Sequence, residues 1–288
     1  MDKYFSDCEK PSLPRTKEEI SNSVWSGIAS LIETEIDNGS FGLNFPEVCE
    51  DGGAITGTNR RNFKNGLLAE IPGMPYPFRS YNVPDKYTIL DFIQFCYEHI
   101  AEPTQGEHHS WRRHYHLTFN QKRGRDNYRD KINRMFSRNM IAFELEESGN
   151  IIRLTNTVLQ EAIYNYNKSS GDNKLDNLLQ KAVEKYLNPK QEVRMESLEK
   201  LWDAWERIKT IGRGKDKKEK TMIILDRAAL EQNFRELLET EAKELTNIGN
   251  KFTIRHTETN QIEIKDYNHV DYLFLRLFSM INLLLVSQ

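Results

Sequence analysis

The residue pair best suited to chemistry in this chain is Arg255 followed directly by His256. A histidine can accept or donate a proton near neutral pH. An arginine stabilises the negative charge that builds on a phosphate during cleavage of a phosphodiester. In RNA the nucleophile can be the substrate's own 2′-hydroxyl, so such a pair needs no metal ion. An Arg–His pair is also common on exposed strands, and its spacing alone does not separate the two interpretations.

The pair lies within a C-terminal half whose apolar spacing predicts helices. Apolar residues recur at helical intervals over 174–187, 190–211 and 221–248, and an apolar segment spans 270–286. Gly249 and Asn250 are natural helix terminators, and the alternating run FTIRHTETNQIEI predicts a β-hairpin that carries the Arg–His pair. We therefore expect an all-α bundle with one short hairpin over 172–288.

The N-terminal half has a mixed composition, which predicts an α+β domain over 1–165. Helices are expected over about 17–36 and 86–101, separated by turn-rich stretches that contain glycine, proline and asparagine. Further on, RDNYRDKINRMFSRN is amphipathic, and IAFELEESGNIIRL alternates around a Ser148–Gly149–Asn150 turn. A helix followed by a two-stranded ribbon is typical of a winged helix-turn-helix, here over about 116–155, although many α+β domains contain the same sequence of elements.

Two basic segments are candidate nucleic-acid contacts. Residues 112–138 hold nine lysines and arginines against two acidic residues, in a chain of net charge −3. On a winged helix this predicts a face that contacts phosphates, whereas a protein-binding face is the alternative. The loop GRGKDKKEK is either a solvated loop or a guide for RNA. The candidate residues are Arg123, Arg125, Arg129, Arg134, Lys217 and Lys218.

No cofactor and no metal site are expected. His108, His109, His114 and His116 lie in a basic loop, and no cysteine is close by in the sequence to complete a closed site. The cysteines, Cys8, Cys49 and Cys96, are widely spaced, and no phosphate-binding glycine loop occurs. The N-terminus lacks the apolar segment of a signal peptide. Residues 270–286 contain an aspartate, an arginine and an asparagine, which favours a buried or subunit-facing helix and a cytoplasmic protein without membrane contact.

Two stretches resemble known families of abortive-infection proteins. The runs IGNKFTIRHTETNQIEI, HVDYLFLRLFSMINLLL and LEKLWDAWERIKTI are similar to the C-terminal HEPN domain of such proteins. YFSDCEK, Trp25, FGLNFPEVCEDG and the winged-helix region resemble the AbiJ-type N-terminal domain, although Cys8 stands where arginine is often found. HEPN ribonucleases usually carry an arginine a few residues before the histidine. Here the only nearby arginine is Arg255, so either Lys251 or Arg255 takes its place or the site is inactive.

The resemblance implies an antiviral, metal-independent endoribonuclease that works as a homodimer, with two His256 segments facing each other. His256 would be the acid/base, Arg255 the phosphate stabiliser, and Asn250 and Lys251 supporting groups. Glu206 and Lys209 form an ordinary helical ion pair in the simplest interpretation, but under the resemblance they orient the histidine. RNA is the expected substrate, and either DNA or a phage-derived trigger would bind the winged helix.

Two alternatives stay open. The chain is also consistent with a non-catalytic winged-helix regulator or sensor that binds nucleic acid and uses the HEPN bundle for dimerisation. It is consistent, too, with a toxin that a partner keeps silent.

Overall fold

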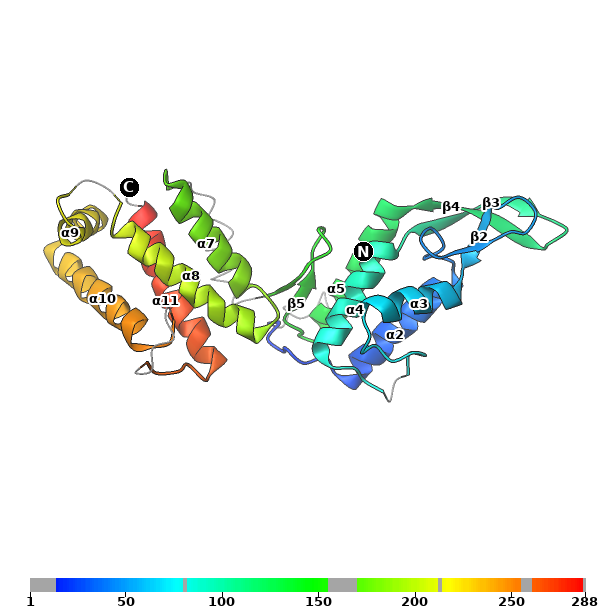
Figure 1. Cartoon of the computed structure of the whole chain (residues 1–288), viewed down its shortest axis with the longest axis horizontal. Coiled ribbons are helices and arrows are strands. Elements are labelled where there is room, and N and C mark those ends of the chain that lie inside the picture. The colour runs from blue at the N-terminus through cyan, green and yellow to red at the C-terminus, as the bar shows by residue number, and fades with distance from the viewer. Residues whose placement is uncertain (1–13, 80–81, 155–169, 212–213, 255–260, 287–288) are drawn as a thin grey trace, which may run out of the picture. The chain divides into compact units, whose positions relative to one another are not determined.

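The computed structural model describes residues 14–79, 82–154, 170–211, 214–254 and 261–286 (Figure 1). The chain divides into two compact units, Met1–Leu154 and Thr155–Gln288. Each unit has its own hydrophobic core. The described fold is α+β and mostly helical, with three small two-stranded sheets. Arg255 and His256 lie outside the described residues.

Within its described residues, the N-terminal unit packs four helices and attaches three hairpins to them (Figure 1). Its buried centre includes the rings of Trp25, Phe63, Phe92, Tyr128 and Phe136. The helices are α2 (Asn22–Asp37), α3 (Arg60–Glu70), α4 (Lys86–His99) and α5 (Gln121–Arg138). The antiparallel hairpins pair β1 (Pro46–Val48) with β2 (Ile55–Thr58), β3 (Glu102–His109) with β4 (His114–Asn120), and β5 (Phe143–Leu145) with β6 (Ile151–Arg153).

Some N-terminal predictions are confirmed and others are wrong. The helix and hairpin expected after residue 116 are present as α5 and β5–β6, while their assignment as a winged helix stays a prediction. The stretch after α2 was expected to be irregular, but it contains the β1–β2 hairpin. In its turn, Gly52 and Gly53 adopt φ of 118° and 75°, which glycine tolerates best. Helix α2, expected to begin at about residue 17, begins at Asn22, because the Ser21 side chain caps it there.

The C-terminal unit is helical throughout its described elements. They are α7 (Asn173–Tyr186), α8 (Gln191–Ile208), α9 (Lys217–Ala228), α10 (Gln232–Lys251) and α11 (Tyr267–Val286). Trp202 and Trp205 are buried, and the rings of Tyr186 and Phe274 stack at 3.9 Å. This organisation follows the predicted amphipathic pattern, whereas its assignment to the HEPN fold stays a prediction.

Three details of the C-terminal prediction are corrected. The helix expected over 221–248 is two helices that contact each other, because Ala229 adopts an extended conformation between α9 and α10 (Figure 1). Gly249 does not end α10, which continues to Lys251. Of the hairpin expected over 252–264, the described residues show an isolated bridge between Phe252 and Ile262, of the parallel type.

Helix α11 is long and apolar enough to cross a membrane by length and composition. The same features belong to a core helix, and half of its most apolar window is buried within the structure. Leu277, Phe278 and Ile281 are among its residues that contribute to the core of the C-terminal unit.

Candidate functional site

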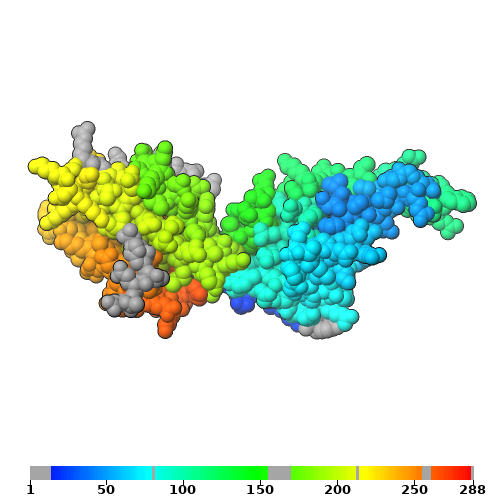
Figure 2. Space-filling model, in the orientation of Figure 1, coloured from blue at the N-terminus to red at the C-terminus, as the bar shows by residue number. Residues whose placement is uncertain are grey.

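A pocket of about 420 Å³ opens where the end of α8 meets α9 and α10 in the C-terminal unit. Four lysines line it and Glu239 is the one acidic residue among the described lining residues; Thr246 and Asn247 add polar groups. The apolar lining residues are Met222, Leu225 and Ala242. In Figure 2 the yellow surface around residues 209–220 adjoins the orange surface of α10. The lysines are Lys209, Lys217, Lys218 and Lys243.

The first turn of α9 fixes two of these lysines. Residues 217–220 were expected to belong to a loop, but they are helical because Asp216 caps the helix and accepts a hydrogen bond from the backbone nitrogen of Glu219 at 2.8 Å. Asp216 and Glu219 have the spacing of a capping box. The acidic side chains at this helix start also match the direction of the helix dipole. Lys217 and Lys218 therefore project from a defined helical turn.

Glu206 joins two of the pocket lysines. One carboxylate oxygen accepts a hydrogen bond from Nζ of Lys209 and the other accepts one from Nζ of Lys217. Lys209 is 6% exposed, and its Nζ also donates to Oγ1 of Thr246 at 3.0 Å and lies 5.1 Å from the centre of the Trp205 ring. A buried ammonium with these contacts is held in one position.

The charge of Glu206 depends on these lysines. Burial is the largest single influence and disfavours the carboxylate, but the hydrogen bonds and charges of Lys209 and Lys217 together outweigh it and lower the pKa of Glu206. Glu206 therefore stays ionised at neutral pH and is occupied by its lysine partners.

The remaining predicted catalytic residues lie on the last turn of α10 or beyond it. Asn250 and Lys251 are exposed there, and the carbonyl of Asn250 accepts a hydrogen bond from Gln261 at 3.3 Å. Arg255 and His256 fall outside the described residues, so the structure does not place them. Among the six residues predicted to be catalytic, the structure therefore brings together Glu206 and Lys209.

Gly249 has a packing role in place of the expected terminating one. A Cβ at this position would lie 2.2 Å from Cδ1 of Trp202. The Trp202 indole donates to the carbonyl of Leu245 at 2.9 Å. The Trp202 side chain of α8 therefore packs against the backbone of α10 at Gly249, directly before the exposed end of α10.

The predicted basic face of α5 makes many contacts within the protein. Arg125 donates to the carbonyls of Tyr97 and Glu98, at the last turn of α4, at 3.1 and 2.7 Å. Arg123 forms an ion pair with Glu102 at 2.9 Å. The other predicted contacts lie on the same helix: Arg129, which pairs with Asp126 at 3.3 Å, and Arg134, which is exposed.

Sequence reasoning missed one group of residues in the N-terminal unit. Cys49 lies beside three of the four histidines noted above, His109, His114 and His116. The argument that these histidines lack a cysteine partner is therefore wrong. The β1–β2 hairpin that carries Cys49 is far from the histidines in the sequence, so local spacing gave no signal of it.

Comparison with known proteins defines the class of this protein. The family described as AbiJ N-terminal domain 4 matches residues 3–169, more than half of the chain. The chain belongs to this family and is an abortive-infection-related protein. No curated protein and no solved structure matches it.

Proposed function

We propose that this protein is an abortive-infection effector that cleaves RNA in the cytoplasm. The observation that carries the proposal is the lysine-lined pocket of the C-terminal unit, because it offers a defined binding place for a polyanionic backbone. The N-terminal family match supplies the defence context.

The charge of the pocket favours phosphate. Among its lysines, Lys243 pairs with Glu239 at 2.8 Å and Lys209 and Lys217 share Glu206. Lys218 is exposed and forms no ion pair within the part of the chain that the structure describes. Four ammonium groups against two carboxylates leave an excess of positive charge, which attracts phosphates and releases their counterions.

The proposed chemistry uses the residues that follow the pocket in the chain. Asn247 lines the pocket, and Arg255 comes eight residues later on the same segment. His256 would take the proton of an RNA 2′-hydroxyl, which attacks the adjacent phosphorus, and a protonated imidazole would deliver a proton to the leaving 5′-oxygen. Arg255 or Lys251 would stabilise the charge on the phosphate. Two copies of a HEPN domain would supply the two histidines of one cleft.

The direct test compares the full-length wild-type protein with His256→Ala on a tRNA pool and on phage transcripts. We expect the wild type to give fragments with cyclic phosphate or 3′-phosphate ends, both in magnesium and after brief exposure to EDTA. We expect His256→Ala to leave the RNA intact. If both proteins leave all RNA intact under both conditions, or cleave it equally, the nuclease proposal is wrong.

A second test addresses the pocket itself. Lys218→Ala removes the exposed ammonium, and Lys181→Ala removes an exposed lysine of α7 that is not among the pocket-lining residues, as a matched control. Binding of single-stranded RNA to the inactive His256→Ala background is measured from low to moderate salt. The slope of log affinity against log salt should fall by about one for Lys218→Ala and stay unchanged for Lys181→Ala. Equal slopes in both variants would contradict RNA binding at this pocket.

The same assays bear on the alternative of a non-catalytic regulator. That reading is favoured if the wild type binds nucleic acid with the expected salt dependence and cleaves none of it. It is also favoured if charge reversal on α5, and not in the pocket, abolishes binding.

A further inference from the structure

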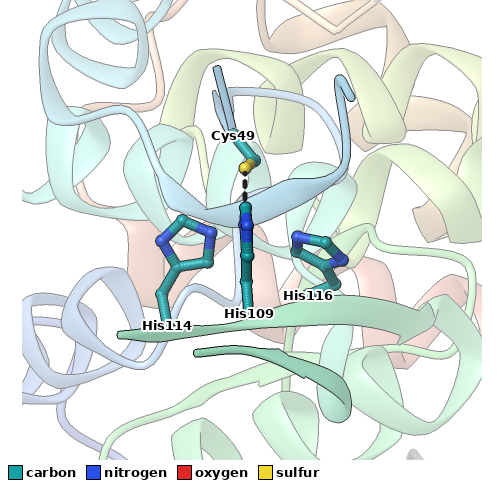
Figure 3. A group of neighbouring side chains, drawn as sticks. All are labelled: Cys49, His109, His114 and His116. Carbon is teal, nitrogen blue, oxygen red and sulfur yellow. Dashed lines mark hydrogen bonds between the residues drawn. The ribbon is translucent and has the colours of Figure 1, made fainter. Parts of the chain in front are cut away.

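We infer that Cys49, His109, His114 and His116 form a structural zinc site in the N-terminal unit. Each residue offers one donor atom, and all four donors lie within 4.8 Å of one another (Figure 3). The inference rests on this geometry and does not depend on the proposed ribonuclease activity.

A bulge in β3 brings the three imidazoles to one face of the β3–β4 ribbon. His114 and His116 are two residues apart on β4 and therefore share a face. Gln105 pairs with Leu117. If this register continued along β3, His109 would lie on the opposite face of the ribbon from His114 and His116. The register shifts between Gln105 and His108, so that His109 pairs directly with His114 and joins its face.

The fourth donor comes from a different hairpin. Cys49 follows β1, is 3% exposed and points toward the histidine face from above it, as Figure 3 shows. Its Sγ lies 3.4 Å from Nδ1 of His109. Zinc–sulfur and zinc–nitrogen bonds of usual length, in tetrahedral geometry, place such a pair about 3.6 Å apart. The thiol and the first imidazole therefore already have the separation that a shared zinc ion requires.

The imidazoles form the base of the site. The ring centres of His109, His114 and His116 are 5.4, 5.5 and 5.6 Å apart, close to an equilateral triangle. Imidazoles bound to one tetrahedral zinc ion have ring centres roughly 5 Å apart. Nε2 of His114 and Nε2 of His116 are buried and have no hydrogen-bond partner among the described residues. Metal coordination would satisfy these nitrogens.

The surroundings also suit a metal ligand. Nε2 of His109 lies 4.0 Å from a carboxylate oxygen of Asp51, and Arg112 holds the same oxygen at 2.9 Å. Zinc-bound histidines commonly direct their second nitrogen toward a carboxylate, which fixes the ring. With Nδ1 facing Cys49, Nε2 of His109 is available for this outer contact.

The ligand set selects the metal and the role. A thiolate with three imidazoles suits zinc rather than magnesium or calcium, which prefer oxygen. Four protein donors leave no open position for water or substrate, as in structural zinc sites. The ion would join the β1–β2 hairpin to the tip of the β3–β4 ribbon. On binding, the Cys49 thiol loses its proton and the three imidazoles coordinate in the neutral form.

The test measures metal binding to the untagged full-length protein. Zinc content is determined by mass spectrometry, and chelator-stripped protein is then titrated with cobalt(II). We expect one equivalent per chain, intense visible bands of tetrahedral cobalt and a thiolate-to-cobalt charge-transfer band. No saturable binding, or octahedral cobalt without the charge-transfer band, would overturn the inference.

Two ligand variants and two control variants identify the ligands. Cys49→Ser should abolish the charge-transfer band, and His114→Ala should weaken binding by more than the roughly 10–100-fold cost of losing an outer-shell partner. Cys8→Ser controls for the thiol. His108→Ala controls for the imidazole, because His108 is exposed on the opposite face of the ribbon, beside Tyr115. Both controls should bind like the wild type. Cobalt spectra that survive Cys49→Ser, or that are lost equally in His108→Ala, would contradict the site.

A fifth variant keeps the test valid if loss of a ligand unfolds the protein. Asp51→Asn leaves all four donors and removes only the outer carboxylate, so we expect a folded protein with cobalt affinity lowered about tenfold or more. Unchanged affinity in Asp51→Asn would contradict the proposed outer contact. Because every readout is metal binding, failure of this inference is distinct from failure of the nuclease proposal.

Discussion

Replacing Gly249 with alanine tests whether the packing of the Trp202 ring against Gly249 is essential to the C-terminal unit. The added Cβ would lie 2.2 Å from Cδ1 and 2.3 Å from Nε1 of Trp202, whereas carbon atoms in contact are usually about 3.5–4.0 Å apart. The indole is 1% exposed, so it has no open space to move into. Its hydrogen bond to Leu245 is lost if it moves.

The expected change in the free energy of unfolding combines one stabilising and two destabilising contributions. Alanine is favoured over glycine in a helix interior by about 1 kcal/mol. Overpacking a well-packed core costs about 1–3 kcal/mol, and loss of the indole hydrogen bond costs about 1 kcal/mol. The net expectation is that Gly249→Ala lowers the free energy of unfolding of the C-terminal unit by about 1–3 kcal/mol.

Urea unfolding monitored by tryptophan fluorescence and by hydrogen exchange of α8 and α10 peptides measures this change. Exchange assigns the effect to the C-terminal unit, because each unit contains two of the four tryptophans. Asn247→Ala is the matched control on the same helix. Asn247 is exposed, and alanine is the better helix former, so this variant should be unchanged or more stable by a few tenths of a kcal/mol.

The result that would refute the reasoning is Gly249→Ala as stable as the wild type, or more stable. Helix propensity would then outweigh the contact, and Trp202 could not pack against Gly249 as described. Equal destabilisation by Asn247→Ala would also contradict it, because the effect would then belong to the end of α10 generally.

Four further predictions concern stability. Gly124→Ala should destabilise the N-terminal unit by about 1–3 kcal/mol in urea, because its Cβ would lie 2.4 Å from the backbone nitrogen of Glu102. Gly27→Ala, with its nearest neighbour at 3.5 Å, should stabilise the same unit by up to about 1 kcal/mol. Asp85→Ala removes the cap of α4 and should cost about 1 kcal/mol by thermal unfolding, and no loss would contradict the capping contacts. Since its lysine partners lower the pKa of Glu206, the carboxylate stabilises the fold above its unfolded pKa of about 4.3, and this stability is lost as pH falls through the folded pKa. Urea midpoints from pH 7 to pH 3 should therefore decline less steeply for Glu206→Gln than for the wild type, and parallel curves would refute this.

The sequence predicted the helices where apolar periodicity was strong and ends were marked. Helix α7 was expected over 174–187 and spans Asn173–Tyr186, and α4 was expected to begin at about 86 and does so, capped by Asp85. The break between α9 and α10 was missed because ALEQ contains neither glycine nor proline. Helix α9 packs against α10, and the local sequence pattern carries no signal of this tertiary contact.

The candidate sites were predicted unevenly for a similar reason. The sequence singled out Lys209, Lys217 and Lys218 by charge, and the structure gathers them around one pocket. It noted the histidines and Cys49 separately but did not associate them, since their association depends on a one-residue bulge and on a hairpin more than fifty residues away. Such a register shift changes which face a side chain occupies without leaving a compositional signal.

The contacts of the basic residues also shift the expected nucleic-acid surface from one unit to the other. On α5, Arg125 binds carbonyls at the end of α4, Arg123 pairs with Glu102, and Lys131 pairs with Glu35 at 2.7 Å, a carboxylate that is largely buried. A phosphate would have to compete with each of these contacts, at a cost for every partner left unpaired. In the C-terminal pocket Lys218 is exposed on a capped helical turn, and a phosphate there adds a contact without breaking an ion pair among the described residues. Local charge density favoured α5, but the charge that is available to a ligand favours the pocket.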